Sequence, residues 1–184
     1  MPRAGLSPEV VTRTATEIVN REGRQALTLA RVAAELGVRS PSLYNHVDGL
    51  DALERSVALA GIDQFAEICR SVVMGRSGLD ALRELASAYR SFAHDQPGAY
   101  ALTQIARPDD VEFGERTQRA LEPIIAVMSG FGLEGDELIH ATRTLRAALH
   151  GFVSLENGRG FGLDVDVDVS FERMVEAMGL GLSR

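Results

Sequence analysis

The chain has 184 residues, 45% hydrophobic and 24% charged, a composition typical of soluble globular proteins that excludes fibrous and wholly disordered classes. All 19 of its basic residues are arginine and its formal net charge is −7, which excludes a uniformly basic nucleic-acid-binding protein. The charge is uneven, however, because residues 1–50 carry 6 arginines against 5 acids, so a local nucleic-acid-binding module at the N-terminus is still open.

The first part of the chain is predicted to form helices separated by tight turns. Ser7 is a suitable N-cap for a first helix that begins at Pro8 and ends at Gly23. Thr28 is predicted to cap a second helix, which Gly37 ends. Apolar residues recur at helical spacing in both segments, so each helix is expected to bury one face.

The next segment is predicted to contain a short helix and then a long one. The short helix is expected over residues 40–46, and the long helix is expected to be capped by Asp48 and to reach about Val73. We expect the domain boundary where the long helix begins. This gives a first domain of residues 1–50 and a second domain of residues 51–184.

The rest of the chain is also predicted to be helical, so the expected fold class is all-α. Its predicted helices cover residues 79–94, 97–105, 111–129, 134–156 and 171–182. The alternating segment 164–169 is interpreted as a loop rather than a strand, with Asp168 or Ser170 as the cap of the last helix. Its aspartates imitate the opening of a calcium loop but lack the required glycine and glutamate, so we expect no metal and no cofactor.

Residues 28–46 have the spacing of a helix-turn-helix. In that motif a tight turn, here at Gly37, lets one helix brace the next in the major groove of DNA. The side chains expected to face outward from the third helix are rich in hydrogen-bonding groups: Arg39, Ser40, Ser42, Tyr44, Asn45 and His46. The spacing alone fits an ordinary helical hairpin with a polar surface equally well.

The segment from Leu27 to Val47, followed by Leu50-Asp51-Ala52-Leu53, resembles the DNA-binding region of TetR-family transcriptional repressors. The likeness includes the Leu-Gly-Val turn, the Leu-Tyr-x-His-Val third helix and the Ala-Leu start of the fourth helix. It implies an all-α homodimer whose fourth helix joins a DNA-binding head to a larger ligand-binding body. The implied partners are a double-stranded DNA operator and a small-molecule effector. The sequence has no apolar run near the roughly 18 residues that a membrane span needs and no signal-peptide pattern, so we expect a cytoplasmic protein without membrane association.

The resemblance also implies a role for each matching residue. Phosphate contacts are expected from Thr28, Tyr44 and His46, because hydroxyl and imidazole groups bind phosphate oxygens without reading the sequence. The residues expected to face base edges are Arg39, Ser40, Pro41, Ser42 and Asn45. Among these, arginine and asparagine can bind guanine and adenine through paired hydrogen bonds.

Leu50 departs from the family pattern, which commonly has a lysine just before the Asp-Ala-Leu of the fourth helix. That phosphate contact is therefore missing or is supplied by another group, such as Arg3, Arg13 or the helix N-terminus itself. We expect a weak electrostatic contribution to DNA binding, and hence a shallow dependence of affinity on salt concentration.

The second domain carries a less detailed signature. Residues 89–94 with 97–100, and residues 149–152, resemble the C-terminal domain of a TetR branch named for a Trp-His-Gly motif, although the tryptophan is absent here. The candidates for lining a ligand cavity are Tyr89, Phe92, His94, Tyr100, Phe113, Met128, His150 and Phe152. Each of them also fits plain core packing. Because acids are abundant in this domain, we expect a cationic or neutral apolar effector.

The predicted 134–156 helix has one apolar face at about 100° per residue. This face comprises Leu138, Thr142, Leu145, Leu149 and Phe152. His140 and Arg143 on the opposite face are interpreted as surface residues, whereas His150 is either a satisfied core histidine or a polar anchor in a cavity. Together with the last helix, this helix offers two apolar stripes, which fit either a four-helix dimer interface or packing within one subunit.

Two other classes of protein are weighed against a regulator. A helical enzyme would need convergent acid–base groups, and only His94, His150 and Glu156 stand out, without a supporting spacing. An architectural DNA-coating protein conflicts with the net charge of −7. We therefore expect a ligand-responsive repressor that binds a palindromic operator as a homodimer, and no enzyme activity.

Overall fold

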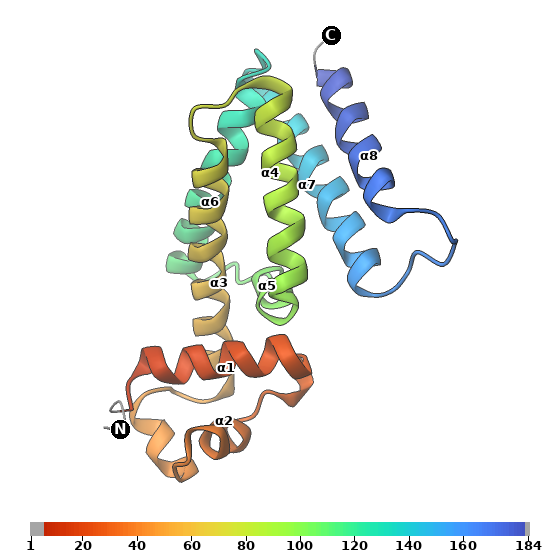
Figure 1. Cartoon of the computed structure of the whole chain (residues 1–184). Helices are drawn as coiled ribbons and strands as arrows, with labels where there is room; N and C mark the ends of the chain where they lie inside the picture. Colours follow the sequence, from red (N-terminus) through yellow and green to blue (C-terminus); the bar gives the residue numbers. More distant parts are fainter. Residues whose placement is uncertain (1–5, 183–184) are drawn as a thin grey trace. The chain divides into compact units, whose positions relative to one another are not determined.

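The computed structural model describes residues 6–182, which are helical without any strand, so the predicted fold class is confirmed (Figure 1). The α-helices of this part are α1 (Pro8–Glu22), α2 (Leu29–Leu36), α3 (Leu50–Val73), α4 (Gly78–Asp95), α5 (Pro97–Thr103), α6 (Val111–Ser129), α7 (Gly135–Asn157) and α8 (Val167–Leu182). Two short 3-10 helices are η1 (Arg24–Ala26) and η2 (Ser40–Asn45). Within residues 6–182, no helix has the length and apolar character needed to cross a membrane.

Side-chain caps and a glycine set the ends of the first two α-helices, as the sequence predicts. Ser7 Oγ accepts the Val10 N–H at 3.3 Å, and Thr28 Oγ1 accepts the Arg31 N–H at 3.0 Å. Gly37 ends α2 with φ at 66°, a left-handed conformation that glycine adopts without steric cost. These three predictions are confirmed.

Two predicted caps are wrong. α3 starts directly after Gly49, whereas Asp48 lies one residue further back. Asp166 caps α8 in place of Asp168 or Ser170, because Asp166 Oδ1 accepts the Asp168 N–H at 2.8 Å. In both places several capping residue types stand close together in the sequence, and only the backbone geometry decides which one meets a free N–H.

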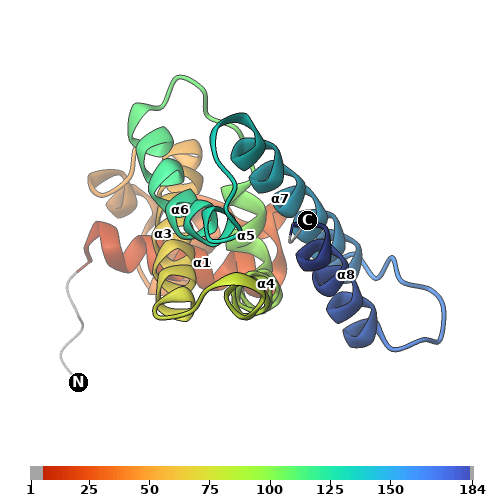
Figure 2. The ribbon, with the colours of Figure 1, turned by 90° about the horizontal axis from the view of Figure 1, so that it is seen from above.

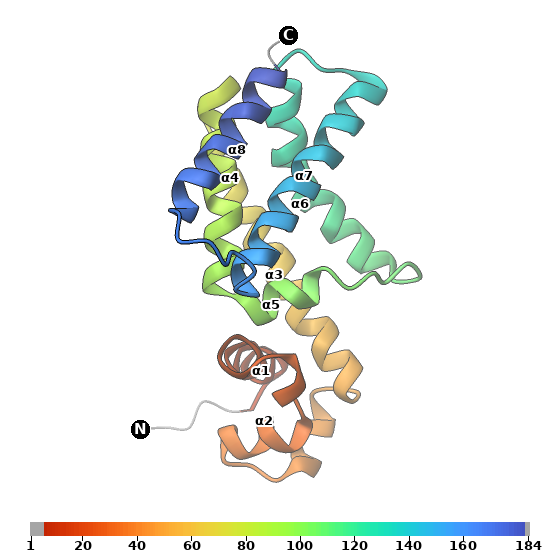
Figure 3. The same cartoon turned by 90° about the vertical axis from the view of Figure 1, so that its right-hand side faces the viewer.

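The chain forms two compact units, and the first runs from the start of the described residues to Asp63 and again over Asp95–Gly114. It contains α1, α2, η1, η2, the first part of α3, α5 and the start of α6 (Figure 3). Its core is built from Val11, Ile18, Val32, Leu43 and Leu53. The domain boundary expected between residues 50 and 51 coincides with the start of α3. The division of the chain at that point stays a prediction.

Within the first unit, α5 packs closely on α1. A Cβ atom at Gly98 would lie 2.1 Å from the Val19 carbonyl oxygen, so only glycine allows this approach. Asn20 Oδ1 accepts the Ala99 N–H at 2.9 Å. The backbone of α5 is therefore fixed directly to the C-terminal part of α1.

The second unit comprises Gln64–His94 and the chain after Gly114, with α4, α7, α8, most of α6 and the end of α3. Figure 2 shows α7 and α8 running side by side. Its core includes Leu82, Leu85, Met128, Leu145 and Leu149. Arg90 on α4 donates hydrogen bonds to Glu156 on α7 and to Asp168 on α8, which ties the three helices together.

The apolar stripes predicted on α7 and α8 face the interior of this unit. Leu145 and Leu149 are buried on α7, and Phe171 and Val175 are buried on α8. These four residues therefore pack within one subunit, which is one of the two alternatives that the sequence left open. His140 and Arg143 are exposed, as predicted.

Candidate nucleic-acid interface

α2, the turn at Gly37 and η2 form the predicted helix-turn-helix in the first unit. The Val38 N–H donates to the Ala33 carbonyl at 3.0 Å and closes the end of α2. Val32 and Leu43 are fully buried, so the inner faces of the two short helices contribute to the core. The opposite side of η2 is left to solvent.

The eight candidate DNA-binding residues divide by exposure. The exposed ones are Thr28, Arg39, Pro41, Tyr44 and Asn45, and the half-buried ones are Ser40, Ser42 and His46. Tyr44 has 61% of its surface exposed, although its neighbour Leu43 is completely buried. The phenol is therefore held by a fixed backbone and presented to solvent, where it can donate a hydrogen bond to a phosphate oxygen.

Thr28 can cap α2 and bind an anion at the same time. Its Oγ1 accepts the Arg31 N–H at 3.0 Å, which uses one acceptor site of the hydroxyl. The hydroxyl proton is still available to an outside acceptor such as a phosphate oxygen. This geometry is compatible with the predicted phosphate contact.

Most arginines of the first unit are already paired with acids. The paired ones are Arg21, Arg24, Arg31, Arg55 and Arg107. Arg24, for example, donates two hydrogen bonds of 2.9 Å to the buried Glu54. Arg13 and Arg39 have no acidic partner among residues 6–182, so both guanidinium groups are available to a ligand. Arg3 lies outside the described residues.

The acids that hold these arginines were not predicted from the sequence. Glu35 follows Arg31 by four residues, a helical spacing that could have been noticed. Glu22 precedes Arg31 by nine residues, and only the turn between α1 and α2 brings the two together. Such a pair carries no sequence signal.

The eight candidate ligand-binding residues are distributed over both compact units. Tyr100 and Phe113 belong to the first unit, and the other six belong to the second. In the second unit, Phe65 contacts Tyr89 and Phe92 with ring centroids 5.3 Å and 5.4 Å apart. Phe65, which the sequence analysis missed, therefore links two of the candidates.

The remaining candidates of the second unit have different surroundings. Phe152 packs against Phe161 and Phe171, and the Arg90 guanidinium lies 4.8 Å from the centre of the Phe171 ring. Met128 is fully buried, His150 is half-buried and His94 is exposed. His94 is therefore the candidate least suited to line an interior cavity.

Comparison with known proteins identifies the family. A family profile described as a tetracyclin repressor-like C-terminal domain matches residues 82–178. The HTH-type transcriptional regulator Rv0681 of Mycobacterium tuberculosis is 41% identical, over 98% of this chain and 84% of that protein. The HTH-type transcriptional regulator YobS of Bacillus subtilis is 32% identical, over 98% of this chain and 95% of that protein.

Solved structures share the fold. A protein from Rhodococcus superposes with a TM-score of 0.84 at 19% identity, covering 98% of this chain and 97% of that one. A variant of TetR from Acinetobacter baumannii, solved in complex with minocycline, has a TM-score of 0.72 at 22% identity, with 97% of each chain covered. No comparison tests the Trp-His-Gly branch, which stays a prediction. The sequence relatives are regulators rather than enzymes, and the chain belongs to the TetR family of HTH-type transcriptional regulators.

Proposed function

We propose that the chain is a repressor that binds a palindromic operator as a homodimer and is released by a small molecule. The observation that carries the proposal is an exposed polar surface, formed by Arg39 directly before η2 and by Tyr44 and Asn45 on η2. Arg39 has no acidic partner among the described residues, so its guanidinium is free to bind guanine through two hydrogen bonds. The Asn45 amide suits adenine in the same way.

Contacts to the DNA backbone would fix the position of η2 in the groove. Thr28 and Tyr44 are both exposed and carry hydroxyl groups, and the half-buried His46 follows Tyr44 by two residues. These groups bind phosphate without reading sequence, whereas Arg39 and Asn45 supply the specificity.

A homodimer is supported by large apolar side chains that α7 and α8 leave exposed. Ile139 and Leu155 on α7 are 48% and 51% exposed, and Leu180 on α8 is 65% exposed. A second copy of the chain would remove such side chains from water. The two heads of the dimer would then reach successive major grooves, roughly 34–36 Å apart.

Release by an effector requires that binding in the second unit change the first. α4 belongs to the second unit as far as His94, and α5 begins three residues later at Pro97 in the first unit. Because Gly98 and Ala99 attach α5 to α1, an effector that moves the end of α4 would also move α1. The effector needs only to prefer the conformation that does not bind DNA, typically by about 1–3 kcal/mol.

We propose that the effector contacts the aromatic group formed by Phe65, Tyr89 and Phe92. Residues 51–184 contain 21 acids and 13 arginines, so this part of the chain is negatively charged. Its charge favours a cationic or neutral apolar effector over an anionic one. The TetR of Acinetobacter baumannii solved in complex with minocycline supports a small-molecule effector for this fold.

Selection of duplexes from a random DNA pool by the purified protein, read out by sequencing, tests the proposal. We expect enrichment of a palindrome whose half-sites are about one helical turn apart, because two identical heads read the two halves. Enrichment of a single half-site would contradict the dimer. No enrichment at low salt would contradict sequence-specific DNA binding.

A further inference from the structure

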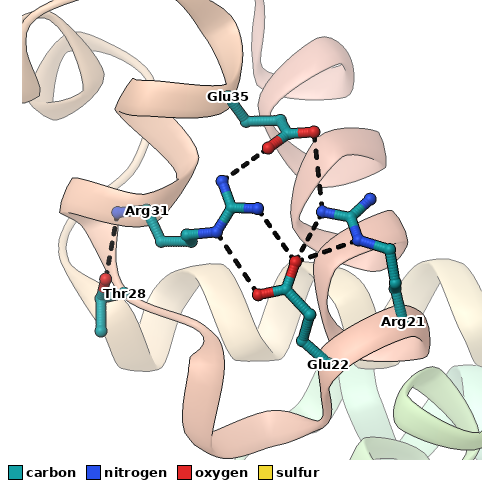
Figure 4. Close-up of polar contacts among 5 residues, drawn as sticks. All are labelled: Arg21, Glu22, Thr28, Arg31 and Glu35. Carbon is teal, nitrogen blue, oxygen red and sulfur yellow. Dashed lines mark hydrogen bonds and ion pairs between the residues drawn. The ribbon is translucent and has the colours of Figure 1, made fainter.

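Two arginines and two glutamates form a closed group of ion pairs between the end of α1 and α2 (Figure 4). Glu22 accepts a hydrogen bond from Arg31 at 2.9 Å and one from Arg21 at 2.7 Å. Glu35 accepts a hydrogen bond from Arg31 at 2.5 Å and lies 3.6 Å from the Arg21 guanidinium. Hydrogen bonds from Arg31 and then Arg21 lower the pKa of Glu22, so this carboxylate stays charged and the group is neutral overall.

This group of ion pairs lies next to the proposed phosphate contact at Thr28. The Thr28 hydroxyl accepts the backbone N–H of Arg31, so a phosphate at Thr28 would lie close to the Arg31 backbone. Figure 4 shows that the Arg31 side chain extends away from Thr28, toward Glu22 and Glu35. All four side chains of the group are partly exposed, and ion pairs of this kind are weak in water. A phosphate would therefore compete for either arginine if the glutamates lost their charge.

We propose that Glu22 and Glu35 hold Arg21 and Arg31 away from the phosphate backbone and so weaken binding to DNA of any sequence. The inference rests on the proposed function, because it requires the first unit to bind DNA. Each arginine on the backbone would add affinity that does not depend on sequence, and a genome offers a vast excess of non-specific sites. With both arginines neutralised, Arg39 carries a larger share of the binding, which is then directed to base edges.

The test is the double variant Glu22→Gln/Glu35→Gln, measured by fluorescence anisotropy on a scrambled duplex and on a selected operator over a series of salt concentrations. Glutamine keeps the size of the side chain but not its charge. For the scrambled duplex we expect about fivefold tighter binding at low salt. The dependence of log affinity on log salt should be steeper by about 1.8, from about 0.9 for each released arginine.

Two further variants separate the release of arginine from a simple change of net charge. Glu9→Gln/Asp109→Asn removes two exposed carboxylates of the same unit that hold no arginine among the described residues, and its salt dependence should match that of the wild type. Adding Arg21→Gln and Arg31→Gln to the double variant removes the released arginines. This quadruple variant should return to the salt dependence of the wild type.

A steeper salt dependence in the double variant alone supports the proposal. An unchanged salt dependence, or an equal change in the Glu9→Gln/Asp109→Asn variant, would overturn it and leave the group as a surface contact between α1 and α2. If circular dichroism shows that the double variant does not fold, Glu35→Gln alone replaces it. The change expected in the salt dependence of this single variant is about half that of the double variant. A wild type that binds neither duplex would overturn the proposed function itself, and this inference with it.

Discussion

Leu50 and Tyr44 are two large side chains of the first unit that the fold leaves open to solvent, with 40% and 61% of their surfaces exposed. Tyr44 has a hydroxyl that can reach phosphate, and Leu50 has no polar group at all. In the TetR pattern a lysine commonly stands at the position of Leu50. Leucine at this position leaves the proposed interface without that cation, in a unit where five arginines are already paired with acids.

Leu50→Lys should therefore strengthen DNA binding. The exposed position can hold an ammonium group without cost to the core, and one new phosphate contact should make log affinity fall more steeply with log salt, by about 0.9. Anisotropy titrations of the selected operator at several salt concentrations measure this slope. Leu163→Lys adds the same charge at an exposed position of the second unit and should leave the slope unchanged. Equal slopes for Leu50→Lys and the wild type would show that position 50 does not meet the backbone.

At the scale of elements, the contact between α5 and α1 is a close backbone approach that depends on one glycine. Gly98→Ala would place a Cβ atom 2.1 Å from the Val19 carbonyl oxygen, so the two helices would have to separate. We expect a loss of about 1–3 kcal/mol in the free energy of unfolding, measured by denaturant titration. The control is Gly114→Ala, a helical position with no atom within 4 Å of the new Cβ. It should be neutral or slightly stabilising, and an equally mild Gly98→Ala would contradict the close packing.

An ion pair at the start of α6 should make the stability of the fold depend on pH. Hydrogen bonds from Arg55 and from the Phe113 N–H lower the pKa of Asp110 from 3.8 to about 2. A carboxylate with a lowered pKa stabilises the fold above its ordinary pKa, and this contribution is lost as the pH falls from about 4 to about 2.

Asp110→Asn should therefore flatten the pH dependence of unfolding over that window, since the amide does not titrate. Denaturant titrations at a series of pH values compare it with the wild type and with Asp109→Asn, which removes a neighbouring exposed carboxylate. If Asp110→Asn and the wild type lose stability in parallel below pH 4, the bond to Arg55 contributes nothing in this window.

The elements could be predicted from the sequence because their signals are local. Ser7, Thr28 and Gly37 act on neighbours three or four residues away, and each takes the predicted role. The division of the candidate ligand-binding residues could not be predicted in this way. Tyr100 follows α4 by only a few residues, yet it lies with α1 in the first unit because α5 packs there. That placement depends on contact between residues about eighty positions apart.

At the scale of the whole molecule, the two units differ in the side chains that they leave exposed. The first unit presents Arg39, directly before η2, and this arginine has no acidic partner among the described residues. Large apolar side chains are exposed on α7 and α8 of the second unit. The proposed division of labour follows from this: the first unit binds DNA, and the second binds a second copy of the chain. Loss of one activity should leave the other intact.

Sedimentation velocity of the protein with its selected operator, for the wild type and for Tyr44→Ala, tests this account most directly. The wild type should form a dimer that binds one palindromic duplex as two chains. Tyr44→Ala should remain a dimer of the same sedimentation coefficient and lose the DNA complex, because Tyr44 is exposed and supports no core contact. A Tyr44→Ala protein that still binds the operator with wild-type affinity, or that becomes monomeric, would contradict the assignment of DNA binding to η2.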